Sequence, residues 1–292
     1  MCSDEAAPGE ENPATRSAPD LSIVVPVHDE EESLPSLVSE IITALEGGPS
    51  WELILVDDGS TDGSASVMED LRTRYPNRLR LLRSRANRGQ SAALGAGFAV
   101  ARADLVATLD ADLQNDPADI PRLVHALDHA PGGPYDAVSG VRRNRRDSWK
   151  RRVASRVANR VRNWAVKDGV RDVGCSLKVY RKRFLVQLPV FDGLHRFLPA
   201  LLQMQGARIT EVDVNHRPRV HGVSKYTIGG RLKRGLYDLV GVRWLQSRWI
   251  DPSAVGEIGG AEGHGGAVVE RKGEGSLDGS DISRGARRGR IG

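Results

Sequence analysis

The chain has 292 residues, of which 39% are hydrophobic, and a formal net charge of +4. This length allows one α/β domain of ordinary size or two small ones, and the apolar fraction is enough for a core. A charge excess this small does not by itself indicate a nucleic-acid partner. The two cysteines, Cys2 and Cys175, argue against a disulfide framework and fit a reducing compartment.

Composition divides the chain into three zones. Residues 1–20 are polar and lack the charged start and apolar stretch of a signal peptide, so we expect a disordered leader. Residues 21–250 contain the apolar periodicity of a folded domain. Residues 251–292 are rich in Gly, Ser, Glu and Arg, and too poor in large apolar residues to form a core, so we expect a disordered tail. No segment approaches the roughly 18 consecutive apolar residues of a membrane-spanning helix, so we expect a soluble or peripheral protein.

Strand and helix patterns alternate through the first part of the domain. The expected strands are residues 21–27, 51–56, 79–82 and 104–109. The expected helices are residues 31–45, 63–75 and 89–101, the last rich in small residues that allow close packing on a sheet. This alternation predicts an α/β fold with right-handed βαβ units on a mostly parallel central sheet and flanking helices. Ligands of such folds bind beyond the carboxyl ends of the strands.

Three of the expected strands end in acidic segments: His28-Asp29-Glu30-Glu31, Asp57-Asp58 and Asp110-Ala111-Asp112-Leu113-Gln114. Carboxylates gathered at one rim repel one another, and a cation would neutralise them. On an extended segment, Asp110, Asp112 and Gln114 would place three oxygen-bearing side chains on one side. Such ligands suit Mg²⁺ or Mn²⁺. The alternative, that the two aspartates only cap a turn, loses weight once all three acidic ends are considered.

Two common phosphate-binding motifs are absent from the sequence. The first strand is not followed by Gly-x-Gly-x-x-Gly, and no Gly-Lys-Ser or Gly-Lys-Thr loop occurs. Neither a dinucleotide fingerprint nor a P-loop is therefore predicted.

A set of motifs in a fixed order resembles glycosyltransferase family 2, and most closely its polyprenyl-phosphate sugar synthases, such as the dolichol-phosphate mannose synthase group. The motifs are Val25-Pro26, Val56-Asp57-Asp58-Gly-Ser-Thr-Asp62, Asn87-Arg88-Gly89, Asp110-Ala-Asp112-Leu-Gln114, Asp172-Val-Gly-Cys175-Ser-Leu-Lys-Val-Tyr-Arg181 and Arg219-Val-His-Gly-Val-Ser224-Lys225-Tyr226. The likeness covers about residues 21–245. It implies a GT-A fold and inverting transfer of a sugar, of mannose or glucose type, from a nucleotide sugar to a polyprenyl or dolichyl phosphate.

The resemblance also implies roles for individual residues. The residues that it places beside the nucleotide are Pro26, His28, Glu30, Val56 and Asp58. The sugar-donor and metal motif is Asp110, Ala111, Asp112 and Gln114, with Asp112 and Gln114 as the direct ligands. The basic positions that hold the donor diphosphate and the acceptor phosphate are Arg219 and Lys225, with Arg142 and Arg152 as further contacts. His28 replaces the usual Tyr and Asp29 the usual Asn, which leaves the identity of the base open.

The chemistry of transfer gives these residues a mechanism. A divalent cation held by Asp112 and Gln114 would stabilise negative charge on the departing nucleoside diphosphate, and Arg219 would add to this. A phosphate acceptor is already ionised near neutral pH, because its second pKa is about 6. A hydroxyl acceptor would need a carboxylate base, and Asp172 is the candidate. Asp172 can equally be a structural turn residue before Gly174.

Two basic amphipathic segments, residues 149–167 and 228–245, bear on the place of the acceptor. Each combines an apolar stripe containing Trp with Lys and Arg on other faces, which suits an anionic membrane surface. Packing of each stripe on the sheet is the alternative. With a lipid-linked acceptor, this predicts a cytoplasmic protein, peripheral on the inner face of a membrane.

Three other functions compete with the lipid-phosphate reading. One is a family 2 glycosyltransferase that acts on a saccharide hydroxyl, and another is a non-catalytic nucleotide-sugar binder, which the intact Asp110, Asp112 and Gln114 disfavour. The third is a nucleic-acid-binding protein, suggested by the basic residues 142–162. That segment has little aromatic interleaving and the acidic strand ends would repel phosphates, so we expect no nucleic-acid partner.

Overall fold

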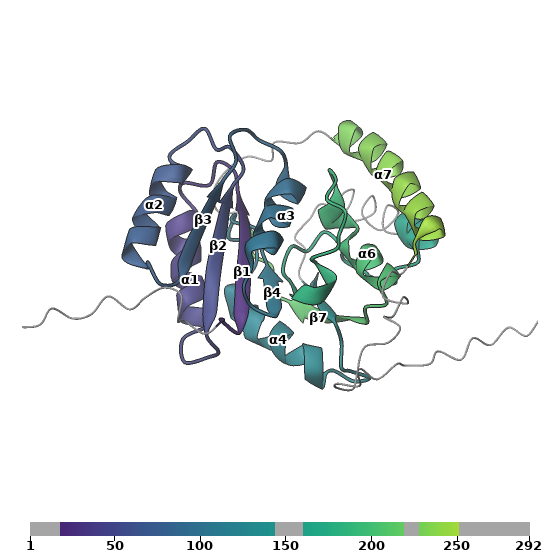
Figure 1. The fold of residues 1–292 in the computed structure, drawn as a ribbon, viewed down its shortest axis with the longest axis horizontal. Helices are drawn as coiled ribbons and strands as arrows, with labels where there is room; N and C mark the ends of the chain where they lie inside the picture. Colours follow the sequence, from purple (N-terminus) through teal and green to yellow (C-terminus); the bar gives the residue numbers. More distant parts are fainter. Residues whose placement is uncertain (1–17, 144–159, 219–227, 251–292) are drawn as a thin grey trace, which may run out of the picture. The chain divides into compact units, whose positions relative to one another are not determined.

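The computed structural model describes residues 18–143, 160–218 and 228–250. Their centre is a seven-stranded sheet in the order β3-β2-β1-β4-β6-β5-β7 (Figure 1). The strands are β1 (Leu21–Val27), β2 (Trp51–Asp57), β3 (Leu79–Arg83), β4 (Leu105–Thr108), β5 (Ala137–Arg142), β6 (Lys178–Arg181) and β7 (Ile209–Val214). All pairs are parallel except those of β6, which runs antiparallel to β4 and β5. The predicted mostly parallel α/β sheet is confirmed.

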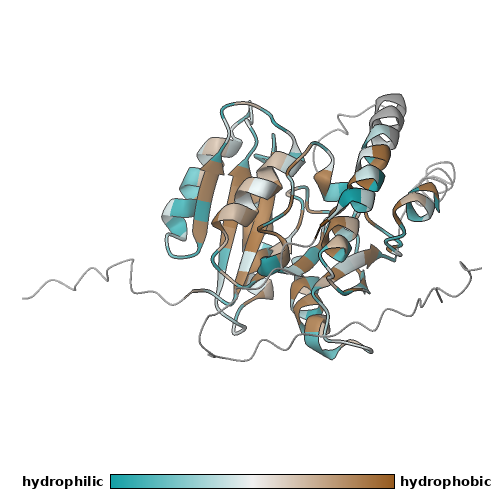
Figure 2. Cartoon of the chain, turned by 45° about the vertical axis from the view of Figure 1, so that its right-hand side comes forward, coloured by the Kyte–Doolittle hydropathy of each residue, from teal (hydrophilic) through white to brown (hydrophobic). Residues whose placement is uncertain are grey.

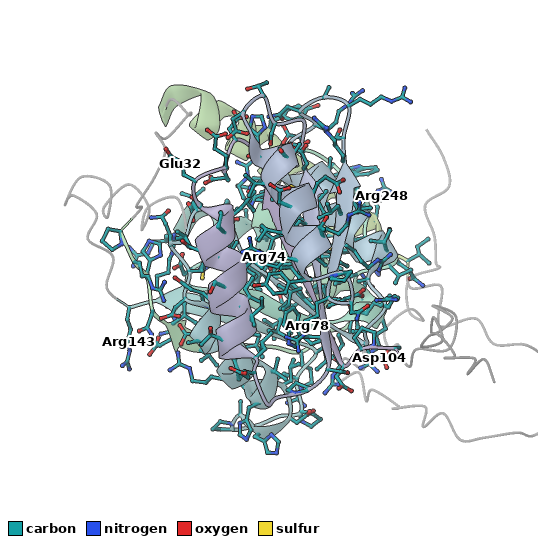
Figure 3. All side chains as sticks on the ribbon, turned by 90° about the vertical axis from the view of Figure 1, so that its left-hand side faces the viewer. Glu32, Arg74, Arg78, Asp104, Arg143 and Arg248 are labelled. Atoms are coloured by element: carbon teal, nitrogen blue, oxygen red, sulfur yellow. The ribbon has the colours of Figure 1, made fainter. Side chains whose placement is uncertain are left out.

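The helices lie on both faces of the sheet. They are α1 (Leu34–Ala44), α2 (Ser64–Arg74), α3 (Gln90–Val100), α4 (Ile120–His129), α6 (Leu198–Met204) and α7 (Ile228–Arg248), with short 3₁₀ turns η2 (Pro117–Asp119), η3 (Lys182–Phe184) and η4 (Leu194–Arg196). One core cluster joins α1, α2 and α4 to the strands, and a second joins α3, α6 and α7 to the opposite face. Figure 3 faces the first layer, with α1 and α2 side by side and the charged Glu32, Arg143 and Arg248 at the edges of the view.

The pattern of burial explains why the first half folds as the sequence predicts. β1 and β2 lie between both helical layers and are almost entirely buried, which is why they read as continuous apolar runs (Figure 2). Alternate residues of β1 enter opposite cores, Val25 with α1 and Val24 with α3. A Cβ at Gly97 of α3 would lie 2.2 Å from a methyl group of Val24. The predicted close approach of this small-residue helix to the sheet is therefore confirmed.

The described parts of the two basic segments show which apolar side chains pack inward. Residues 160–166 are helical, with Val166 buried and Trp164 80% exposed. In α7, Val242 is buried and Leu239 and Leu245 pack on the second core cluster. No helix in residues 18–143, 160–218 and 228–250 is long and apolar enough to cross a membrane.

One apolar face of α7 does not pack on the sheet. Tyr237, Val240 and Trp244 follow one another at helical spacing and are 82%, 70% and 63% exposed. The apolar stripe predicted in residues 228–245 is therefore divided, with Leu239 packed on the core and Val240 and Trp244 at the surface.

The predicted tail, residues 251–292, lies outside the described residues. We expect that truncation after Ile250 changes the melting temperature by no more than about 2 °C, because a segment without a hydrophobic core contributes little to the free energy of unfolding. Thermal unfolding of the full chain and of the truncated chain, followed by circular dichroism, measures this. A drop of about 10 °C would show that the tail packs on the domain.

Candidate active site

The first two acidic strand ends are used to tie loops together. Asp29 Oδ1 accepts the N–H of Thr61 at 2.7 Å, and Glu31 Oε2 accepts the N–H of Gly63 at 2.6 Å. Asp57 Oδ1 accepts the N–H of Ser60 at 2.8 Å. Backbone donors therefore compensate these carboxylates. The idea that all three acidic ends require a cation is not supported at these two.

Asp58 fixes the loop that leads into α3. Its two carboxylate oxygens accept the N–H groups of Arg88 and Gly89, each at 2.7 Å. The next residue, Gly59, has a positive φ of 70°, and a Cβ there would lie 2.6 Å from the backbone of Ala86 and Asn87. The loops after β2 and β3 are thus packed backbone to backbone, which only glycine permits.

The third acidic end differs, because one of its carboxylates has a strongly perturbed environment. Asp110, just beyond β4, accepts a hydrogen bond from Gln90 Nε2 at 2.7 Å. Burial and the charge of Asp112 raise the pKa of Asp110 to about 6. Asp112 is buried beside it, and a divalent cation would relieve the repulsion that disfavours the ionised form of Asp110.

The local geometry of this motif corrects one expectation. Asp110, Asp112 and Gln114 do not alternate along an extended segment, since β4 ends at Thr108 and Leu113 has a φ of 61°. Asp112 Oδ1 accepts the N–H of Gln114 at 3.2 Å, closing a turn that competes with extended backbone. The buried Leu113 side chain anchors this turn in the core, holding a conformation that non-glycine residues rarely adopt.

A cavity of about 880 Å³ opens beside Asp110, at the carboxyl ends of β1 and β4. Of the predicted site residues described in the structure, His28 and Asp110 line it. The other predicted residues that the structure describes do not line it: Pro26, Glu30, Val56, Asp58, Ala111, Asp112, Gln114, Arg142 and Asp172. Its volume falls in the range of roughly 300 to 1,000 Å³ that is usual for small-ligand sites.

The cavity also contains residues to which sequence reasoning gave no role. Gln90, Lys178, His195 and Arg196 line it. Gln90 directly follows the quoted Asn87-Arg88-Gly89, and Lys178 lies inside the quoted residues 172–181, so position within a motif could have pointed to both. His195 and Arg196 lie in the turn η4, whose short length carries no periodic signal.

Lys178 is a buried basic residue in the cavity wall. Its Nζ donates to the carbonyl oxygen of Val173 at 3.1 Å and to that of Cys175. Burial lowers the pKa of this lysine, and the nearby carboxylate of Asp110 opposes that shift. With Arg88 and Arg196 also in the wall, basic side chains outnumber Asp110 and Asp192, which favours an anionic ligand.

Asp172, the candidate base, is held in an ion pair. Arg142 Nε donates to Oδ2 of Asp172 at 2.8 Å, and an Arg142 terminal nitrogen donates to Oδ1 at 2.7 Å. Both side chains are largely buried and neither lines the cavity. Bidentate pairing of this kind fixes geometry and stabilises the ionised carboxylate, so it fits a positioning role better than proton abstraction.

The chain returns to the metal motif just before the predicted phosphate-binding segment. The N–H of Arg217 donates to the carbonyl of Gln114 at 2.8 Å, and the Arg217 side chain pairs with Glu40 and Asp116 at 2.7 and 2.8 Å. Arg219, Lys225 and Arg152 lie outside the described residues.

An open, mostly parallel sheet with helices on both faces and a polar cavity at its strand ends defines an α/β protein whose candidate ligand site lies beyond the carboxyl ends of the strands. The family model described as "Glycosyl transferase family 2" matches residues 22–188. The chain therefore belongs to glycosyltransferase family 2.

Known proteins extend this finding. The chain is 41% identical over 221 residues to an undecaprenyl-phosphate 4-deoxy-4-formamido-L-arabinose transferase of Aeromonas hydrophila subsp. hydrophila; the match covers 75% of this chain and 66% of that relative. Crystal structures of glucosyl-3-phosphoglycerate synthase from Mycobacterium tuberculosis share the fold. The complex with Mg²⁺ and UDP has a TM-score of 0.58 at 20% identity, covering 80% of this chain and 81% of that one. The complex with Mn²⁺, UDP-glucose and phosphoglyceric acid has a TM-score of 0.57 at 19% identity, with the same two shares covered. The predicted GT-A fold is confirmed.

Proposed function

We propose that this protein transfers a sugar from a nucleotide sugar to a polyprenyl phosphate, with inversion at the sugar carbon. The observation that carries the proposal is the cavity at the carboxyl ends of β1 and β4, where the Asp110 carboxylate faces a basic wall. The relative from Aeromonas, whose name states an undecaprenyl-phosphate acceptor, supports this class of acceptor.

The proposed cation is Mg²⁺ or Mn²⁺, held by Asp112 and Gln114 with Asp110 beside them. The residues fit such an ion, since all three carry hard oxygen atoms and Asp110 lies next to the buried carboxylate of Asp112. When bound, the ion would stabilise the charge of the departing nucleoside diphosphate. Gln90 orients Asp110 through its hydrogen bond, and the turn at Leu113 sets the separation of Asp112 and Gln114.

The acceptor class follows from the groups that surround the cavity. A hydroxyl acceptor needs a positioned base, yet Asp172 is paired with Arg142 and does not line the cavity. A phosphate acceptor needs positive charge instead, and the lysine and arginines of the wall supply it. We assign the capture of the donor diphosphate and the acceptor phosphate to Arg219 and Lys225, with Arg152 in support. Arg142, the other basic residue expected there, is paired with Asp172 and does not line the cavity, so it is left out of this assignment. Arg217, which is described, donates its N–H to the carbonyl of Gln114 in the metal motif.

The identity of the transferred sugar is the part of the proposal on which two lines of support differ. The resemblance to the dolichol-phosphate mannose synthase group favours a hexose of mannose or glucose type, whereas the relative from Aeromonas is named for an arabinose derivative. The testing experiment incubates the protein with undecaprenyl phosphate, Mn²⁺ or Mg²⁺ and a panel of radiolabelled UDP- and GDP-sugars, and follows label into an organic phase. Transfer only to water-soluble saccharide acceptors would replace the proposal by the saccharide-hydroxyl alternative.

We also propose that the protein works at the cytoplasmic face of a membrane, which it meets through α7 and residues 149–167. The exposed Tyr237, Val240 and Trp244 form an apolar face on α7, and Arg231, Lys233 and Arg234 belong to the same helix. A helix that combines exposed aromatic residues with basic residues in its sequence suits an anionic lipid surface.

Binding to anionic vesicles is the check on this surface. Each basic residue near such a surface contributes about 1 kcal/mol, so we expect binding at low salt that weakens as the Debye length falls to about 8 Å. The triple replacement of Arg231, Lys233 and Arg234 by Gln, and that of Tyr237, Val240 and Trp244 by Ser, should each weaken sedimentation with vesicles at least about tenfold. Val186→Ser, at an exposed valine elsewhere, is the control. Equal sedimentation of all four proteins would contradict the assignment.

A further inference from the structure

A chain of hydrogen bonds fixes the ring of His195 in the cavity wall. The N–H of Gly193 donates to Ser91 Oγ at 3.1 Å, and Ser91 Oγ lies 3.0 Å from His195 Nδ1. Ser91 is buried in α3. Gly193 has a φ of 95°, and a Cβ there would lie 2.6 Å from Arg196, so this turn requires glycine. The ring is thereby anchored to α3 from a segment about a hundred residues away in sequence.

These hydrogen bonds determine which ring nitrogen of His195 carries the proton. Ser91 Oγ already accepts the N–H of Gly193. Among these hydrogen-bonded groups, the acceptor available to the hydroxyl proton of Ser91 is His195 Nδ1. The opposite arrangement would leave a buried hydroxyl proton without an acceptor, which costs free energy. Nδ1 therefore accepts and Nε2 carries the hydrogen. Burial, with the charges of Arg196 and Lys178, lowers the pKa of His195 to about 3, so the ring is neutral at physiological pH.

This neutral N–H donor lies in the same cavity as the metal motif's Asp110. Neighbouring residues of α3 make the two contacts, because Gln90 binds Asp110 and Ser91 binds His195. Both Asp110 and His195 line the same cavity. A diphosphate held at the metal motif would carry its sugar into this cavity, since the sugar is bonded directly to the diphosphate. A neutral N–H donor suits a sugar hydroxyl, whereas a phosphate binds more strongly to the charged basic side chains.

We propose that His195, oriented by Ser91, recognises the sugar of the nucleotide sugar through a hydrogen bond from Nε2–H to a sugar hydroxyl. The inference rests on the proposed function and deepens it. His195 is a specificity-determining residue that acts on the sugar and not on the nucleotide, and Ser91 is a positioning residue that acts through it.

The test compares a nucleotide sugar with its own nucleoside diphosphate. Calorimetry in Mn²⁺ gives dissociation constants for UDP, GDP, UDP-glucose, UDP-N-acetylglucosamine and GDP-mannose. For the nucleotide sugar that the wild type binds most tightly, His195→Phe should weaken binding about tenfold, and the matching diphosphate should change less than about twofold. His195→Gln, which keeps an N–H donor, should recover part of the loss. Ser91→Ala should change affinity in the same direction but less, and His125→Phe, at an exposed histidine of α4, is the control.

The outcomes separate the inference from the proposed function. Equal losses for the diphosphate and the nucleotide sugar in His195→Phe would overturn the inference alone, and so would an Nδ1–H tautomer of His195 in long-range ¹H–¹⁵N spectra of the wild type. Absence of binding of every nucleotide by the wild type would overturn the proposed function, and the inference with it. If His195→Phe does not fold, His195→Gln and Ser91→Ala carry the same comparison.

Discussion

Asp112→Asn is expected to reduce sugar transfer about 10³-fold while the protein stays folded. The substitution keeps the size of the buried side chain and an oxygen that can accept the N–H of Gln114, but removes the charge that would hold the cation. Loss of a group that stabilises charge on the leaving oxygen commonly costs a factor of about 10² to 10³, and here the ion itself is affected. Transfer to undecaprenyl phosphate at saturating donor, with and without Mn²⁺, measures the effect.

Matched controls make this expectation sharp. Asp70→Asn removes one charge from an exposed position on α2 and should leave transfer unchanged. Circular dichroism and thermal unfolding establish that Asp112→Asn is folded. Full turnover of the wild type in excess chelator would contradict the metal assignment, whatever the variant does.

The strands and helices of the first half could be predicted because their burial produces local patterns of apolar residues in the sequence. β1 and β2 are covered by helices on both faces, so they appear as uninterrupted apolar runs, and α1 presents Leu34, Leu37, Val38 and Ile41 at helical spacing to the sheet. The order of the parallel strands then brings the three acidic ends to one rim.

The details of the rim could not be predicted, because they depend on contacts between segments far apart in sequence. Residue type shows that Asp58 is acidic, but not that its oxygens accept two N–H groups of the loop 30 residues later. Likewise, the pairing of Asp172 with Arg142, 30 residues away, favours a structural role for that carboxylate over a role as a general base. His195 acquires its place only when η4 packs on α3. Alternation in Asp110-x-Asp112-x-Gln114 was misleading for a different reason, since a turn closed by Asp112 itself displaces the extended backbone.

Lys225→Ala is expected to reduce transfer to undecaprenyl phosphate by about 10² or more, while leaving vesicle binding and donor hydrolysis within about twofold. The reasoning is that a phosphate nucleophile, already ionised near neutral pH, depends on positive charge for its position and needs no base. Arg219→Ala should instead slow both transfer and hydrolysis, because the diphosphate leaves in both reactions. Lys182→Ala, in the turn η3 away from the cavity, is the control for the loss of a lysine.

Comparing transfer with donor hydrolysis shows whether Lys225 holds the acceptor phosphate or the donor diphosphate. If Lys225 holds the acceptor phosphate, raising the concentration of undecaprenyl phosphate should restore part of the rate of Lys225→Ala, since weaker binding can be overcome by mass action. Donor hydrolysis in water involves no acceptor phosphate and should not respond to Lys225. A parallel fall of hydrolysis and transfer in Lys225→Ala would place this lysine on the donor. Unchanged transfer would remove Lys225 from the site, and the capture of the lipid phosphate would pass to the basic wall formed by Lys178 and Arg196, whose positions in the cavity are fixed by Val173 and Asp238.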